Sequence, residues 1–362
     1  MKRYQAFDPP EYVDWAPDPA LVAAFAATVR RDPERRAVVD ALDEATVVGL
    51  YAGLVRTRLQ DIVLKRWVRT GVLSKAWLGT GEEAMTVGPV HALDRSRDIV
   101  VPMIRNAGAC AEMGMPIADN FRSYLGTADA PSGGRDLHAG SLAHRVLQPI
   151  SHVGDVVPVV TGMALVSRIR GESFLALTWI GDGSTKTGTA HEGLNFAAVQ
   201  KVPAIFVIHN NRVALGTRLA QYHLPEDFAG LAEAYGMAGG VFDGNNVLDA
   251  YAATRLAAER CRAGAGPVML VGNTFRMGGH ATHDEREARA LFPADVFADW
   301  GRKDPVGLYE EHLKDLGVAA PVLAGVEARV EAEVAQAEQE ALRSRDDRVP
   351  APATAVEGVY AD

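Results

Sequence analysis

Two short polar motifs, each placed directly after an apolar run, constrain this chain more than any other feature. Gly181-Asp182-Gly183 follows the run FLALTWI, and Asn210-Asn211 follows the run AIFVI. Residues 189–200 between them read as a helix, so we predict a right-handed strand–helix–strand crossover. Both motifs then emerge at the carboxyl edge of a parallel sheet, which is where open α/β sheets bind ligands.

The residue types at this edge predict a magnesium ion and a phosphate group. Asp182 and Asn211 offer a carboxylate and an amide oxygen, and Mg²⁺ prefers oxygen ligands and completes its shell with water and substrate phosphates. Gly181 and Gly183 leave the backbone bare, so an anion can approach the N–H groups near Ser184, where the next helix starts. A P-loop is disfavoured, because GDGSTKTG lacks a Lys-Ser/Thr pair after its last glycine.

Alternating strands and helices along the chain predict an α/β fold with a doubly wound parallel sheet flanked by helices. We divide the chain into an N-terminal extension (1–42), a binding domain (43–318) and a C-terminal helix with a flexible tail (319–362). Further expected elements are a long helix from Asp43, helices at 79–92, from Val157, at 226–235 and at 247–263, and strands at 98–104, 239–243 and 267–273.

Composition argues against several classes of protein. A net charge of −9 over 362 residues, with no basic stretch interleaved with aromatic residues, disfavours nucleic-acid binding. No apolar run reaches the length of a membrane span, and the N-terminus lacks the apolar core of a signal peptide, so we expect a cytoplasmic protein. Cys110 and Cys261 are too few for a disulfide framework and lack metal-ligand spacing.

Residues 43–316 resemble the alpha subunit of the thiamine diphosphate-dependent, decarboxylating component of 2-oxo acid dehydrogenase complexes. The GDG and NN motifs look like the thiamine diphosphate motif, and AHEGLNFAAVQKVPAIFVIHNN is similar to the family pattern along its length. The resemblance implies thiamine diphosphate and Mg²⁺ as cofactors. It also implies that a 2-oxo acid, branched-chain or pyruvate, is decarboxylated and that its acyl group passes to a lipoyl group. An acetoin dehydrogenase alpha subunit is an alternative, since the loop GRDLHAGS suits that branch as well.

The resemblance also carries over a set of cofactor-binding positions. Asp182 and Asn211 match the side-chain metal ligands, and the backbone carbonyl of Val213 matches the third protein ligand. Arg105 matches an arginine on the diphosphate, and Arg276 matches a second cationic position near it. Cations are needed because a diphosphate carries roughly three negative charges, of which Mg²⁺ offsets about two.

Three more positions concern the pyrimidine ring and the reaction. Ser151 and Val153 match a stretch whose backbone holds the aminopyrimidine and whose apolar side chain bends the cofactor. His280 matches a histidine at the thiazolium pocket that assists substrate and acyl transfer, and an imidazole can move one proton near neutral pH. A zinc site of His280, His283 and Asp284 is disfavoured, because their spacing is no zinc signature.

The same resemblance implies that this chain alone does not supply every residue of the active site. The glutamate that activates the pyrimidine comes from a separate beta subunit, which implies a heterotetramer of two alpha and two beta chains working with a lipoyl-bearing acyltransferase. Glu82 matches a family acid, to which we assign a structural role, and Ala281 stands where mitochondrial relatives carry a regulatory phosphoserine. Ile104 and His209 depart from the family pattern and leave a non-catalytic paralogue as an alternative. Met103, Val213 and Phe275 depart from it as well, and together these five positions put the affinity for the cofactor in question.

Overall fold

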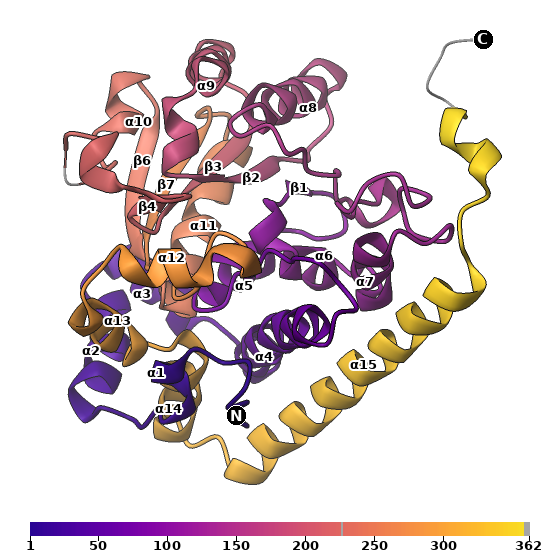
Figure 1. The fold of residues 1–362 in the computed structure, drawn as a ribbon. Helices are drawn as coiled ribbons and strands as arrows, with labels where there is room; N and C mark the ends of the chain where they lie inside the picture. Colours follow the sequence, from indigo (N-terminus) through magenta and orange to yellow (C-terminus); the bar gives the residue numbers. More distant parts are fainter. Residues whose placement is uncertain (226, 358–362) are drawn as a thin grey trace.

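The computed structural model describes residues 1–225 and 227–357, and within them no helix is both long and apolar enough to cross a membrane. Its centre is a parallel sheet with the strand order β1-β2-β3-β7-β6 (Figure 1). The doubly wound α/β fold predicted from the sequence is confirmed. The strands of this sheet are β1 (Ile99–Val101), β2 (Ala176–Gly181), β3 (Ala204–Asn210), β6 (Ala238–Asp243) and β7 (Val268–Asn273), and β4 (Val213–Ala214) pairs with β5 (Thr217–Arg218) in a separate antiparallel hairpin.

The predicted strand–helix–strand crossover is present. β2 and β3 pair in parallel with Gly181 opposite His209, and α9 (Gly188–Gln200) connects them. The hydroxyl oxygen of Thr187 accepts the N–H of Ala190 and so satisfies one of the free donors at the start of that helix. The two polar motifs therefore leave the sheet at the same edge.

Helices cover both faces of the sheet (Figure 1). Successive side chains of a strand point to opposite faces. Ile180 and Phe206 accordingly pack toward α8 and α9, whereas Trp179 and Val207 pack toward α5 and α11. The bounds of the covering helices not yet given are α5 (Glu83–Ala92), α8 (Val156–Arg170) and α11 (Val247–Arg262).

A further helical layer packs outside α5 and α11 and includes α2 near the start of the chain and α15. Its long helix α4 begins after Asp43, whose carboxylate accepts the N–H of Thr46. Phe25, Leu54 and Val330 come from the three predicted parts of the chain and share one core; the division itself stays a prediction. The other helices are α1 (Pro10–Val13), α2 (Pro19–Arg30), α3 (Pro33–Asp40), α4 (Glu44–Arg69), α6 (Gly108–Glu112), α7 (Ile117–Leu125), α10 (Leu231–Ala234), α12 (Glu285–Ala290), α13 (Ala294–Gly301), α14 (Pro305–Asp315) and α15 (Ala320–Asp347).

The helix predicted at 79–92 starts later than expected. It begins only at Glu83, because the preceding residues form a turn held by side chains. Oδ2 of Asp61 accepts the N–H of Gly79 at 2.9 Å, and Oε2 of Glu83 accepts the N–H of Gly81 at 3.0 Å. These two side-chain carboxylates bind backbone N–H groups at the position where the first turn of a helix was expected.

Two other predicted elements are wrong in part. The strand expected at 98–104 ends at Val101, because Pro102 cannot donate to the ladder, and Arg105 lies in a 3₁₀ turn at Ile104–Asn106. Of the helix expected at 226–235, residue 226 lies outside the described residues, and within 227–235 the α-helix is only the four residues of α10. A 3₁₀ turn lies further upstream at Leu219–Gln221. The helices α6 and α7 were not predicted.

A helix and a 3₁₀ turn lie in the C-terminal segment, and the flexibility of its tail stays a prediction. Helix α15 continues to Asp347, and a 3₁₀ turn follows at Pro352–Val356. Near the end of α15 the hydroxyl of Ser344 donates to Asp129 at 2.9 Å and accepts from Arg122 at 3.0 Å, which ties the helix to the loop after α7. The prediction for residues 358–362 lies outside the described residues.

Candidate functional site

Asp182 is the first residue after β2 and is buried. Its backbone N–H donates to the carbonyl oxygen of His209 at 3.1 Å, and its Oδ1 accepts the N–H of Gly183 at 2.7 Å. Its Oδ2 is also buried and makes no hydrogen bond of normal geometry among residues 1–225 and 227–357, although the hydroxyl of Tyr222 lies near this carboxylate. Burial raises the pKa of this carboxyl. Because a buried carboxylate oxygen without a partner is costly, the arrangement fits a site that a cation completes.

Asn211 follows β3 at the same edge. Its Nδ2 donates to Oε1 of Glu82 at 2.9 Å, and its Oδ1 accepts the N–H of Val213 at a long 3.3 Å. These contacts define which side of the amide carries the oxygen, and that oxygen keeps a second lone pair for another partner. The structure thus brings Asp182 and Asn211 to one edge, while the roles of these two side chains and of the Val213 carbonyl as ligands stay predictions.

Glu82 connects these residues to Arg105, a role that the sequence analysis did not assign. Its carboxylate is buried, forms an ion pair with Arg105 and lies with Oε1 3.6 Å from Nδ1 of His209. Burial alone would raise the pKa of Glu82, but Arg105, His209 and Asn211 together lower it to about 2. Glu82 is therefore a carboxylate at neutral pH and holds Arg105 beside Asn211.

Arg276 and His280 add positive potential to the site. The buried guanidinium of Arg276 donates to the carbonyl oxygens of Gly278 at 3.2 Å and Leu215 at 2.7 Å, and no carboxylate in the described ranges pairs with it. Burial and the nearby Arg105 lower the pKa of Arg276 to about 10. Burial, Arg105 and Arg276 lower the pKa of His280 to about 4, so His280 is neutral at pH 7. An anion placed here would offset the repulsion between the two guanidiniums.

The turn after Asp182 differs from the expectation in one respect. The N–H groups near Ser184 belong to a 3₁₀ turn at Gly183–Lys186, and α9 starts only after it. A Cβ on Gly183 would collide with the Cβ of Ala214 in the β4–β5 hairpin, so this glycine permits a close approach within the chain itself. At Gly181 the nearest atom to such a Cβ is Oγ of Ser184 at 3.5 Å, which leaves ordinary space.

Ser151 and Val153 lie in an irregular segment before α8, and both side chains are exposed. Gly154 packs so closely on Thr187 that a Cβ there would collide with the threonine hydroxyl. The segment therefore lies against the turn that follows Asp182, and the role of Ser151 and Val153 stays a prediction. The side chain of Val153 is 61% exposed, which fits a surface that another molecule covers.

The carboxylate of Asp284 binds backbone N–H groups of the loop that carries His280, a structural role that the sequence analysis did not assign. Its carboxylate oxygens accept the N–H groups of His280 at 3.0 Å and Ala281 at 2.7 Å and so shape the loop that carries His280. In the described part of the chain, no group of three or more His, Cys, Asp or Glu side chains is arranged to hold a metal. A cation at Asp182 would therefore need amide and backbone oxygens as further ligands.

Two neighbours of the site gave no sequence signal. Nδ2 of Asn106 donates to Oγ1 of Thr86 at 2.7 Å and lies 3.3 Å from Nε2 of His209. Tyr222 lies close enough to Asp182 that, after burial, the aspartate charge raises the pKa of its hydroxyl. Both reach the site from loops or turns, where no periodic pattern marks a side chain as inward-facing.

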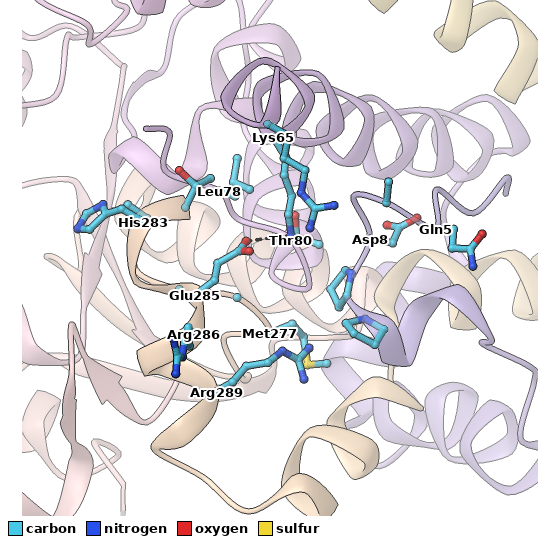
Figure 2. A pocket seen from close by; sticks show the side chains of 18 residues that line it. Gln5, Asp8, Lys65, Leu78, Thr80, Met277, His283, Glu285, Arg286 and Arg289 are labelled. Atoms are coloured by element: carbon cyan, nitrogen blue, oxygen red, sulfur yellow. Dashed lines mark ion pairs between the residues drawn. The ribbon is translucent and has the colours of Figure 1, made fainter. Parts of the chain in front are cut away.

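A cavity of about 470 Å³ lies behind the loop that carries His280 (Figure 2). Its lining includes Gly278, Gly279 and Ala281, which flank His280 in the sequence, but neither Asp182 nor Asn211. The cavity is therefore distinct from the edge of the sheet where the two polar motifs meet.

Comparisons with known proteins agree with this architecture. The chain is 32% identical over 280 residues to the 2-oxoisovalerate dehydrogenase subunit alpha of Bacillus subtilis, which covers 76% of this chain and 84% of that protein. It is 31% identical over 287 residues to the pyruvate dehydrogenase E1 component subunit alpha of Staphylococcus aureus (78% and 74%) and 32% identical over 279 residues to the 3-methyl-2-oxobutanoate dehydrogenase subunit alpha of Mycobacterium tuberculosis (76% and 73%). A family model described as dehydrogenase E1 component matches residues 52–349, and the chain belongs to that family.

Proposed function

We propose that this chain is the alpha subunit of a thiamine diphosphate- and Mg²⁺-dependent 2-oxo acid dehydrogenase. It would decarboxylate a branched-chain 2-oxo acid or pyruvate and reductively acylate a lipoyl group. The observation that carries the proposal is the buried, unpartnered Oδ2 of Asp182 at one edge with Asn211, in a member of the dehydrogenase E1 component family. Relatives named for 2-oxoisovalerate, pyruvate and 3-methyl-2-oxobutanoate support this substrate class and favour neither the acetoin nor the non-catalytic alternative.

The residues at the sheet edge suit a magnesium diphosphate. Oδ2 of Asp182 and Oδ1 of Asn211 are the oxygen types that Mg²⁺ prefers. Arg276, whose charge no described carboxylate offsets, would balance part of the remaining negative charge of the diphosphate, and Arg105, already paired with Glu82, would add hydrogen-bond donors. When bound, thiamine diphosphate supplies a carbon nucleophile that adds to the keto carbon and takes up the electrons left when CO₂ departs.

His280 would move the proton that acyl transfer requires. Its imidazole is neutral at pH 7, because burial and the two nearby guanidiniums disfavour the charged form. The neutral imidazole can then pass a proton on, because one ring nitrogen can accept a proton from solvent while the other donates its own to the lipoyl sulfur as the disulfide opens. The Asp284 carboxylate that caps the loop holds the backbone of His280 in place for this step.

We assign the glutamate that activates the pyrimidine to a beta subunit. The face of the chain next to Ser151 and Val153 carries exposed apolar side chains on α8 and α9, which lie side by side in Figure 1. Exposed apolar patches of this kind mark contacts between proteins, which supports contact with a beta chain; the number of two alpha and two beta chains rests on the family resemblance. The lipoyl acceptor would be carried by an acyltransferase. The exposed residues are Val159, Val166, Ile169, Phe196 and Val199.

The test is to purify the chain with its beta partner and to follow 2-oxo acid-dependent reduction of an artificial acceptor. We expect activity with pyruvate or a branched 2-oxo acid that requires both thiamine diphosphate and Mg²⁺. Asp182→Ala should abolish it, whereas Asp299→Asn, an exposed carboxylate on α13, should not. Activity that persists without cofactor and cation, or that is confined to acetoin, would contradict the proposal.

A further inference from the structure

The cavity next to the His280 loop is lined in part by residues that lie outside the region matched by the family model. One wall is the N-terminal segment, defined here as residues 5–10, and another is the end of α4. The third is the His280 segment, defined as residues 277–289 (Figure 2). The family match begins at residue 52, so the N-terminal wall lies outside the matched region.

The N-terminal wall and the His280 segment are fastened together. Two guanidinium nitrogens of Arg289 donate to the carboxylate of Glu11 at 2.8 and 2.7 Å, a bidentate pair. Tyr12 is fully buried in a cluster that includes Met277. Asp8 faces the buried Arg58 at 3.7 Å, so its charge is offset within the protein. The cavity is therefore a built feature and not a gap beside a loose terminus.

Positive charge exceeds negative charge in the cavity lining. Its charged residues are Lys65, Arg69, Arg286 and Arg289 against Asp8 and Glu285. Lys65 and Glu285 pair at 2.9 Å across the cavity (Figure 2), and Arg289 is offset by Glu11. Within residues 1–225 and 227–357, neither Arg69 nor Arg286 has a carboxylate partner, so two guanidinium charges remain at the cavity.

One of these guanidiniums is held by the N-terminal segment. The guanidinium of Arg69 lies over the ring of Phe7, 5.8 Å from its centre. Such a contact restricts the long side chain without consuming its hydrogen-bond donors. Arg69 belongs to α4 and Arg286 to α12, and both residues line the cavity.

We propose that this cavity binds a small organic or inorganic dianion between Arg69 and Arg286. Its volume, about 470 Å³, lies in the range of small-molecule sites, which is about 300–1,000 Å³. Two uncompensated guanidiniums match two negative charges, as carried by a phosphate ester or a dicarboxylate. The ligand would contact Gly278, Gly279 and Ala281 and would thereby influence the backbone that positions His280. Binding itself does not depend on the proposed function; only this effect on His280 does.

The experiment is titration calorimetry of the full chain with its beta partner, using inorganic phosphate in one arm and succinate in the other. Thiamine diphosphate and Mg²⁺ are present at saturation, so that the anion cannot report on the cofactor residues. We expect one site per chain for at least one probe, and at least tenfold weaker binding in Arg69→Gln/Arg286→Gln. Both arginines are exposed, so the double variant should melt at the wild-type temperature.

Two comparison variants make the result decisive. Arg343→Gln, at an exposed position near the end of α15, should bind like wild type, and so should Arg276→Gln. No binding of either probe, equal binding by the double variant, or an equal loss in Arg343→Gln would overturn the proposal. So would a loss confined to Arg276→Gln, which would place the anion at the sheet edge. A complex that binds the anion but shows no 2-oxo acid activity would contradict the proposed function and leave this site standing.

Discussion

Replacing Glu82 with glutamine should destabilise the cation-free chain by about 3 kcal/mol at pH 7. In the structure the buried carboxylate pairs with Arg105 and accepts an N–H of Asn211. These contacts and His209 lower the pKa of Glu82 from 4.5 to about 2, and at about 1.4 kcal/mol per pKa unit this fall corresponds to about 3 kcal/mol. Glutamine can still accept the hydrogen bond from Asn211, but it leaves the charge of Arg105 unpaired.

The same contribution should disappear in acid. Because the pKa is lower in the folded state than in the unfolded state, the stabilisation is complete above pH 4.5 and is lost as the pH falls toward 2. By pH 3 about 2 kcal/mol of it should be gone. The measurement is urea denaturation of the full chain, followed by tryptophan fluorescence at pH 7, 5 and 3 with EDTA present.

The matched control is Glu233→Gln, which removes an exposed carboxylate on α10. It should differ from wild type by less than about 0.5 kcal/mol at every pH. A difference between wild type and Glu82→Gln that stays constant from pH 7 to pH 3 would refute the reasoning, because it would show that the lost interaction does not depend on the ionisation of Glu82.

Other parts of the site lead to three further predictions. His280→Gln should lower turnover by about 10²–10⁴-fold with little change in thiamine diphosphate affinity. In the wild type, the acid limb of the pH profile of kcat/KM should lie near pH 4, and a limb at pH 6.5 would contradict the lowered pKa of His280. Asp182→Asn should abolish Mg²⁺-dependent cofactor binding in calorimetry. It should also raise the free energy of unfolding of the cation-free chain by roughly 1–3 kcal/mol, because it removes a buried charge without a partner. A variant less stable than wild type would argue against a cation site. Gly183→Ala should collide with Ala214, displace the β4–β5 hairpin and weaken cofactor binding about tenfold in the same calorimetry; unchanged affinity would contradict the tight fit.

The α/β crossover and the position of both polar motifs could be predicted because each depends on local pattern. An apolar run followed by a polar turn places Asp182 and Asn211 at strand ends, whatever the rest of the chain does. The parallel pairing of β2 and β3 then brings the two residues to one edge. The start of α11, predicted at residue 247, was equally local, since the side chain of Asn246 accepts the N–H groups two and three residues ahead.

Tertiary structure alone decided which groups share the site and which carboxylate oxygen is left without a partner. Glu82, Arg105 and Asn211 come from three separate elements, and only packing shows that they form one buried network. The late start of α5 has the same cause, because Asp61 on α4 captures the N–H of Gly79 from outside the helix. The pattern of apolar and polar residues in one segment indicates which of its side chains face water and which face the core. Contacts between distant segments depend on how all the layers pack together.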